Sequence, residues 1–195
     1  MTRQLENTVA LITGSSSGIG AATARRLAAE GAAVALVARR RDRLDDLAAE
    51  IRADGGTALV VPADVTSQQQ AAGAVEQAVA GLGRLDIVVS NAGIMLLGPA
   101  LDAPIDEWDQ MVALNVQGML YIAHAALPHL VRAAEDPPRR VADLVTISST
   151  GGASPRRRGS GAAAPRGLCR ACPARSGPPS GPTRRSGRPG PAPAA

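Results

Sequence analysis

Aromatic residues are nearly missing from this 195-residue chain, which has no Phe, one Trp (Trp108) and one Tyr (Tyr121). Its hydrophobic content of 45% therefore comes from aliphatic side chains, and we expect a core of Val, Leu, Ile and Ala. A chain of this length is large enough to form one α/β domain with a core of its own.

Long apolar runs are also missing. No stretch of about 18 uninterrupted apolar residues occurs, which predicts that no helix spans a membrane. The first residues, Met-Thr-Arg-Gln-Leu-Glu, carry charge and lack the apolar centre of a secretion signal. These two absences favour a cytoplasmic location.

Lysine is absent altogether, so the 21 basic residues are all arginines, and the charges are unevenly distributed. Residues 1–152 hold 12 arginines and all 17 acidic residues, a net charge of −5. Residues 153–195 hold nine arginines and no acidic residue, a net charge of +9. The overall charge of +4 therefore combines two different compositions, which meet near residue 153.

Strand and helix patterns alternate over the first 152 residues. We expect strands at residues 8–13, 33–38, 58–61, 85–89 and 141–147, and helices at 18–30, 41–53, 67–80 and 104–132. Ser67 is the expected N-cap of the third helix, Gly31 ends the first, and Pro128 is a candidate kink in the last. This alternation predicts right-handed βαβ units and a parallel sheet.

A glycine-rich turn, Thr13-Gly14-Ser15-Ser16-Ser17-Gly18-Ile19-Gly20, follows the first predicted strand. Backbone N–H groups at the start of a helix point toward a bound phosphate, and the helix dipole favours negative charge there. Glycines at 14, 18 and 20 allow the sharp turn and the close approach of a pyrophosphate. The turn alone is weak evidence, because ordinary strand–helix turns also contain glycine.

Four later motifs strengthen that evidence: Asp64-Val65-Thr66, Asn91-Ala92-Gly93, Asn115-Val116-Gln117-Gly118 and Ile147-Ser148-Ser149. In this order, over residues 5–152, the set resembles the short-chain dehydrogenase/reductase family. Residues 91–99 resemble in particular its actinobacterial, clavaldehyde-dehydrogenase-like members. The resemblance implies an α/β fold with a Rossmann-type doubly wound parallel sheet, of which this chain contains the first five of the usual seven strands.

The resemblance also implies which residues bind the cofactor. The pyrophosphate turn would comprise Gly14, Ser16, Ser17, Gly18, Ile19 and Gly20. Asp64 would accept a hydrogen bond from the adenine amino group, and Val65 would pack on the ring. Asn91, Ala92 and Gly93 would lie beside the nicotinamide ribose, preceded by Ser90 where the family has Asn.

The end of the second predicted strand indicates which nicotinamide cofactor is used. An NAD(H) enzyme places an acidic residue there for the ribose 2′-hydroxyl, whereas this chain has Ala38 followed by Arg39. A guanidinium group suits bidentate bonding to a 2′-phosphate, so we predict NADP(H) rather than NAD(H). The alternative is that the arginines merely solvate the start of a helix, although cations there oppose the helix dipole.

The reaction implied by the resemblance is hydride transfer to or from a small carbonyl or secondary alcohol. Ser149 would hold the substrate oxygen, and Asn115 would hold a water molecule in the proton path. The family's Tyr and Lys, which act as the acid/base pair, are absent: the expected positions hold Ala162 and Arg166. We therefore expect this chain to be inactive, and we expect no metal in the site.

Residues 153–195 form a tail in which 34 of the 43 residues are Ala, Gly, Pro or Arg. This composition cannot build a core and predicts disorder. A frameshift in GC-rich DNA would produce it, and the change begins just after the last family motif. The alternative is a non-catalytic nucleotide-binding module whose basic tail binds nucleic acid or an acidic partner. Two cysteines, Cys169 and Cys172, cannot complete a zinc shell.

Loss of the later family segments should also affect stability. The strand at 141–147 would lie at an apolar exposed edge, which favours aggregation and poor solubility. Family members form dimers or tetramers through two long helices, and because one of these helices is missing, we do not expect that assembly here. The sequence predicts no binding to membranes or, in the enzymatic interpretation, to nucleic acid.

Overall fold

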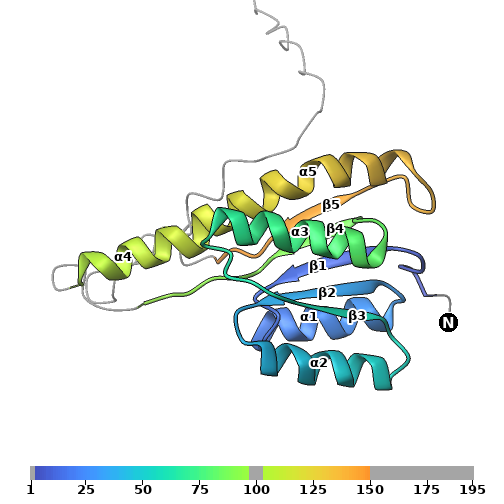
Figure 1. The fold of residues 1–195 in the computed structure, drawn as a ribbon, viewed down its shortest axis with the longest axis horizontal. Coiled ribbons are helices and arrows are strands. Elements are labelled where there is room, and N and C mark those ends of the chain that lie inside the picture. The colour runs from blue at the N-terminus through green and yellow to red at the C-terminus, as the bar shows by residue number, and fades with distance from the viewer. Residues whose placement is uncertain (1–2, 97–102, 150–195) are drawn as a thin grey trace, which may run out of the picture.

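The computed structural model describes residues 3–96 and 103–149. Five strands form one parallel sheet in the order β3-β2-β1-β4-β5. The strands are β1 (Val9–Thr13), β2 (Ala33–Ala38), β3 (Ala58–Pro62), β4 (Ile87–Ser90) and β5 (Asp143–Thr146). The predicted α/β fold with a Rossmann-type parallel sheet is therefore confirmed (Figure 1).

The helices are α1 (Gly18–Ala29), α2 (Arg41–Ala53), α3 (Gln68–Leu82), α4 (Ile105–Val112) and α5 (Met119–Glu135). Two predicted helix ends are confirmed. The Ser67 hydroxyl accepts a hydrogen bond from the Gln70 amide at 3.4 Å, as an N-cap does. Gly31 lies just past α1 with a φ of +101°, a conformation that glycine adopts without strain.

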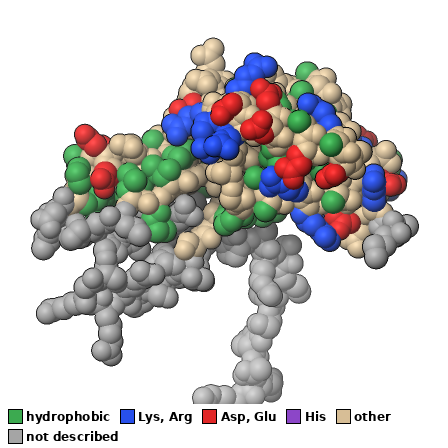
Figure 2. All heavy atoms as spheres, turned by 90° about the horizontal axis from the view of Figure 1, so that it is seen from below, with side chains coloured by type: hydrophobic (Ala, Val, Ile, Leu, Met, Phe, Trp, Pro, Cys, Tyr) green, Lys and Arg blue, Asp and Glu red, His purple; other side chains and the backbone are tan. Residues whose placement is uncertain are grey.

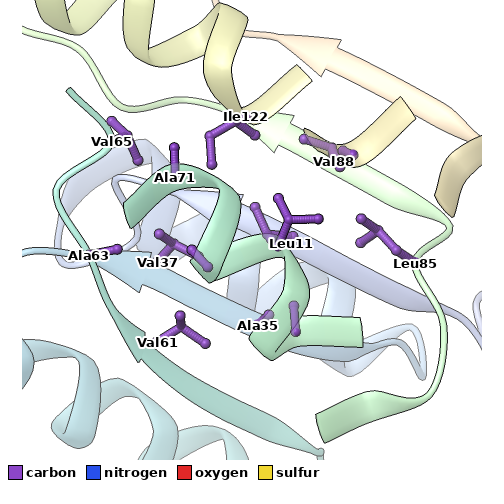
Figure 3. Close-up of a cluster of buried hydrophobic side chains, with 14 of the residues drawn as sticks. Leu11, Ala35, Val37, Val61, Ala63, Val65, Ala71, Leu85, Val88 and Ile122 are labelled. Atoms are coloured by element: carbon purple, nitrogen blue, oxygen red, sulfur yellow. The ribbon is translucent and has the colours of Figure 1, made fainter. Parts of the chain in front are cut away.

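Helices cover both faces of the sheet and produce two aliphatic cores. Alternate residues of β1 show the division: Val9 and Leu11 face α3 and α5, whereas Ala10 and Ile12 face α1 and α2. Figure 3 shows the first core, in which Ile122 and Ala71 of the helices lie over Leu11 of the sheet. No aromatic side chain belongs to the buried part of either core, as the composition predicts.

The predicted long helix is present, but it is not regular. Between α4 and α5 the chain forms a π-helical segment, η1 (Ala113–Gly118), and α5 then continues through Pro128. The whole helix Ile105–Glu135 is long and apolar enough to cross a membrane, by length and composition alone. One such helix is weak evidence for a span, because core helices of soluble proteins pass the same test, and α5 packs against α3 and β4.

Strand β5 lies at the edge of the described sheet, and its side chains are poorly covered. Leu144 and Val145 are each 42% exposed. Helix α5 also presents apolar side chains to solvent, with Leu127 49% and Val131 60% exposed. The predicted apolar exposure of this edge is thus confirmed for the described residues, while poor solubility stays a prediction.

Candidate cofactor-binding site

A cleft of about 520 Å³ opens at the carboxyl ends of the strands. It lies where the strand order reverses, since the chain leaves β1 for β2 and β3 and later returns to place β4 on the other side of β1. Ligands of open α/β sheets bind at such switch points. The cleft is lined by Gly14, Ser16, Ser17, Ile19, Val37, Ala38, Arg39, Arg40, Ala63, Asp64, Val65, Asn91, Ala92, Gly93, Ile94, Leu114 and Ile147.

The glycine turn is shaped by backbone packing that excludes larger residues. Gly14 has a φ of +67°, and a Cβ atom built on it would lie 2.8 Å from the Ala92 Cα. A Cβ atom on Gly20 would overlap the carbonyl oxygen of Gly14, and Gly18 has a φ of +57°. Packing therefore requires glycine at 14 and 20, the positive φ favours it at 18, and of the three only Gly14 lines the cleft. Ser16, Ser17 and Ile19, at the start of α1, line the cleft, and a helix N-terminus in such a place suits a pyrophosphate.

Asn91 ties the glycine turn to the loop after β4. Its Nδ2 donates hydrogen bonds to the carbonyl oxygens of Thr13, at 3.0 Å, and Gly14, at 3.3 Å. The Thr13 hydroxyl accepts hydrogen bonds from the amides of Asn91 and Ala92, each at 3.0 Å. The predicted Asn91–Gly93 motif therefore holds the turn in place as well as lining the cleft.

Asp64 follows β3, and its carboxylate is held by the loop that it begins. Its Oδ1 accepts hydrogen bonds from the Thr66 amide, at 3.0 Å, and the Thr66 hydroxyl, at 2.8 Å. Burial raises the pKa of Asp64, but these two hydrogen bonds and the charge of Arg39 outweigh it, so the pKa lies below its ordinary value. Asp64 is therefore an anion at neutral pH. The contact with an adenine amino group stays a prediction.

Two arginines follow β2 and line the same cleft. Arg39 is the residue predicted from the sequence for the 2′-phosphate. Arg40 was not predicted, and the structure shows its Nη2 donating to the hydroxyls of Ser16, at 2.9 Å, and Ser17, at 3.2 Å. The sequence signal was present in the run of arginines after β2, but nothing in it distinguishes one arginine from the next.

The two predicted catalytic residues do not line the cleft itself, although their neighbours Leu114 and Ile147 do. Asn115 belongs to η1 and is 8% exposed. Its Oδ1 accepts from the amide of Ile94 and its Nδ2 donates to the carbonyl oxygen of Ile94, both at 2.8 Å. Ser149 is half-buried just beyond the end of β5. Ala162 and Arg166, at the positions expected for Tyr and Lys, lie outside the described residues.

Comparison with known proteins decides the family. A family model described as short chain dehydrogenase matches residues 8–164. The chain belongs to this family. An uncharacterized oxidoreductase of Staphylococcus aureus strain MRSA252 is 39% identical over 150 residues, which are 75% of this chain and 64% of that protein. A short chain dehydrogenase of Pseudocercospora fijiensis is 38% identical over 148 residues, 75% of this chain and 46% of that protein.

Solved structures of the short-chain dehydrogenase family have the same fold. A short-chain type dehydrogenase/reductase from Mycobacterium marinum matches with a TM-score of 0.73 and 35% identity, over 82% of this chain and 62% of that one. A 7α-hydroxysteroid dehydrogenase complexed with NADH and 7-oxo glycochenodeoxycholic acid matches with a TM-score of 0.72 and 27% identity, over 80% of this chain and 58% of that one. The chain thus spans less than two thirds of the length of these relatives.

Proposed function

We propose that this chain binds NADP(H) in the cleft at the carboxyl ends of β1, β2 and β4, and that the type of protein it represents is a cytoplasmic oxidoreductase of small carbonyls or secondary alcohols. One observation carries the proposal. Arg39 and Arg40 follow β2 and line the cleft, Arg40 bonds to the hydroxyls of Ser16 and Ser17, and Ala38 stands where an NAD(H) site has an acidic residue.

In this proposal, different residues would bind different parts of the cofactor and the substrate. The glycine turn and the start of α1 would hold the pyrophosphate, and the guanidinium groups would hold the 2′-phosphate. The bound cofactor supplies the hydride acceptor or donor. Ser149 would bind the substrate oxygen, while Asn115 fixes the loop after β4 through its two bonds to Ile94.

We further propose that the 195-residue chain binds the cofactor without turning it over. A proton donor for the substrate oxygen is needed in the family's chemistry, and this chain contains no lysine and one tyrosine. That residue, Tyr121, lies on α5, is partly buried and packs against the core cluster to which α3 and α5 contribute. It is therefore not available as the acid/base. Steady NADPH oxidation by the purified chain with a panel of carbonyl compounds would overturn this part of the proposal.

Fluorescence titration of the full chain with NADPH and NADH tests the binding. We expect saturable binding, tighter for NADPH. Gly14→Ala should abolish it, because the added methyl group would collide with Ala92 and the φ of +67° strains any residue with a Cβ. Gly73→Ala is the matched control, since its methyl group would meet nothing closer than the Gln77 side chain at 4.0 Å. Binding of neither nucleotide by the unaltered, folded chain would refute the proposal.

The alternative function, a binding module with a basic tail, concerns residues 153–195, which lie outside the described part. It predicts salt-sensitive binding of nucleic acid that is lost when these residues are deleted. Binding that survives the deletion, or no binding at all, would end this alternative without affecting the cofactor proposal.

A further inference from the structure

Gly118 ends η1 and stands inside the long helix, where glycine is unfavourable. Its φ of −59° and ψ of −41° are ordinary helical values, which residues with a side chain adopt without strain. Alanine stabilises the interior of a helix relative to glycine, because glycine has more backbone freedom to lose on folding. The backbone conformation therefore gives no reason for glycine at this position, and the reason has to come from what packs against it.

The space beside Gly118 is filled by Val65. A Cβ atom built on Gly118 would lie 3.0 Å from the Val65 Cγ2 and 3.2 Å from the Val65 carbonyl oxygen, both closer than ordinary van der Waals contact. Gly73 on α3 differs, because its Cβ atom would meet nothing closer than the Gln77 side chain at 4.0 Å. Packing thus requires glycine at 118, and the neighbour that needs the room lines the proposed cofactor cleft.

Val65 has little freedom to retreat, because the loop that carries it is fastened by hydrogen bonds. The Asp64 amide donates to the Gln70 Oε1 on α3 at 3.0 Å, and the Thr66 amide and hydroxyl donate to the Asp64 carboxylate. The Val65 side chain is 5% exposed and belongs to the same buried cluster as Ile122 of α5 (Figure 3). Its β-branched carbon also restricts rotation about χ1. A methyl group added to Gly118 would therefore press on a residue that is already held in place.

Both sides of this contact reach the cleft. Val65 lines it from the loop after β3, and Leu114, in the same π-helical segment as Gly118, lines it from η1. The contact between Gly118 and Val65 thus limits how closely η1 can approach the loop after β3. Whether the loop or the helix yields to an added methyl group, the spacing between two lining side chains changes.

Val65 lies on the adenosine side of the proposed cofactor. In NADP(H) the 2′-phosphate is attached to the ribose that also carries the adenine. Arg39, proposed for that phosphate, lies near enough to Asp64 to lower the pKa of its carboxyl group, and Val65 follows Asp64 directly in the chain. The adenine would therefore lie beside Val65, whose apolar side chain suits the face of a base.

We infer that Gly118 is a positioning residue for the adenine end of the cofactor cleft. The absence of a side chain at this position lets η1 pack against Val65 and sets the spacing between the lining residues Val65 and Leu114. This inference rests on the proposed cofactor site. It gives the long helix a part in binding the adenosine half of the cofactor, in addition to the two bonds by which Asn115 holds Ile94.

The effect of this contact depends on shape and not on charge. The three atoms nearest to a Cβ built on Gly118 all belong to Val65, which carries no charge. Charged side chains gather elsewhere: Figure 2 shows acidic and basic side chains mixed over the face formed by α1 and α2, where Arg25 pairs with Glu50. A methyl group at position 118 therefore leaves the attraction of the phosphates unchanged, and its effect on cofactor affinity should be the same at low and high salt.

The experiment compares Gly118→Ala, Val65→Ala and the double variant, with Gly73→Ala as the matched control. Calorimetric titration of the full chain gives Kd values for NADPH and for its two halves, adenosine 2′,5′-bisphosphate and reduced nicotinamide mononucleotide. A thermal melt of each variant verifies folding. We expect Gly118→Ala to weaken NADPH and the adenosine bisphosphate by the same factor, about 5-fold or more, because overpacking distorts a well-packed contact. The reduced mononucleotide should change less than about 2-fold, since distant sites are nearly independent.

Removing the methyl groups of Val65 should restore binding in the Gly118→Ala background. Val65→Ala deletes the Cγ2 atom that the added methyl group would meet first, so the double variant should bind NADPH more tightly than Gly118→Ala alone. Val65→Ala by itself should weaken NADPH about 2- to 3-fold, because it removes apolar surface from the wall of the cleft. Gly73→Ala should bind all three ligands as the unaltered chain does.

A role of Gly118 through Asn115 predicts a different pattern. If Gly118→Ala acts by shifting Asn115 and its bonds to Ile94, the reduced mononucleotide loses affinity and the adenosine bisphosphate does not. That pattern, equal losses for all three ligands, no loss for NADPH, or additive losses in the double variant would each overturn the inference while leaving the proposed function intact.

The double variant also covers the case in which Gly118→Ala does not melt cooperatively. It should then fold and bind the adenosine bisphosphate within about 3-fold of Val65→Ala, because the obstructing atom is gone. Failure of the double variant to fold, or a larger loss, would overturn the inference. If the unaltered chain binds none of the three ligands, the proposed function itself is refuted, and the inference that rests on it is refuted as well.

Discussion

Strands β2 and β5 are both parallel and both paired in regular register, yet one is buried and the other is not. Five of the six residues of β2 are buried, whereas three of the four residues of β5 are exposed. Strand β2 lies between β1 and β3, with α1 and α2 on one face and α3 on the other. Strand β5 has one described neighbour, β4, and packs against α5. Backbone pairing therefore determines the position of a strand in the sheet, whereas its burial depends on helices that cover both faces.

The predicted cofactor-binding residues and the predicted catalytic residues come from these two differently buried parts of the sheet. The glycine turn, the arginines and Asp64 follow strands of the well-covered half, β1 to β3. Asn115 and Ser149 come from the other half, where η1 and the end of β5 carry them. The cleft that would bind the cofactor thus follows mainly the buried strands, whereas Ser149 follows the exposed edge strand, and Asn115 is buried on η1.

The largest effect on stability is expected from truncating one leucine in each of the two strands. Leu36→Ala in β2 removes a side chain with no exposed surface and should lower the free energy of unfolding by about 2–5 kcal/mol. Leu144→Ala in β5 should cost less than about 1 kcal/mol, because the side chain is already 42% exposed. Urea denaturation of both variants measures the difference. Equal losses of unfolding free energy in the two variants would show that the side chains of β5 are covered in solution.

The second test concerns the buried carboxylate that joins the two halves. Asp86 has no exposed surface; it accepts from the Val9 amide at 2.9 Å and pairs with Arg84, which also donates to the carbonyl oxygen of Pro137. Asp86→Asn should lower the free energy of unfolding by about 2–3 kcal/mol, since charged hydrogen bonds are lost in a buried site. Asp143→Asn breaks the more exposed pair with Arg139 and should cost less than about 1 kcal/mol. A reversed order in thermal melts would contradict this assignment.

A third, smaller effect depends on pH. The folded-state pKa of Asp64 is lowered, so its contribution to stability is fully present above the ordinary pKa of an aspartate and is lost as the pH falls through the folded value. The unaltered chain should therefore be more stable than Asp64→Asn at pH 7, by less than about 1 kcal/mol after solvent screening. The gap should close under acid conditions. A gap that stays constant down to low pH would show that the carboxylate charge is not the cause.

The smallest effect is expected at Ser90. Its hydroxyl is buried, with the residue 5% exposed, and has no hydrogen-bond partner among residues 3–96 and 103–149. Ser90→Ala removes an unsatisfied polar group from the end of β4, so the free energy of unfolding should stay within about 1 kcal/mol of its original value or rise. A loss well above that would mean that the hydroxyl is bonded in solution, for which a buried water molecule is the simplest partner.

The regular elements were predictable because local patterns govern them. The range 41–53 was predicted to form a helix, and α2 occupies Arg41–Ala53. Its apolar residues recur at helical spacing, and the glycines that follow mark its end. The glycine turn was predictable for the same reason. The contact of Arg40 with Ser16 was not, because three consecutive arginines look alike in sequence and side-chain geometry decides which one reaches the turn. Nor did the pattern reveal η1, since its apolar residues also fit an ordinary helix.

The π-helical segment between α4 and α5 has a consequence for how the long helix tolerates change. Such a segment holds more backbone per turn than an α-helix and is comparable to one inserted residue. Deleting one residue from Ala113–Gly118 would let the helix run regularly, and α4 and α5 would keep nearly the same faces toward the rest of the protein, because the wider turn already absorbs about one extra residue. Met111 would therefore stay buried, whereas Asn115, which lies inside the irregular turn, would lose its two bonds to Ile94. A deletion within this turn should therefore disturb the position of Asn115 while leaving the packing of α4 and α5 largely intact, whereas the same deletion in a regular part of α5 should rotate one part of the helix by about 100° relative to the other.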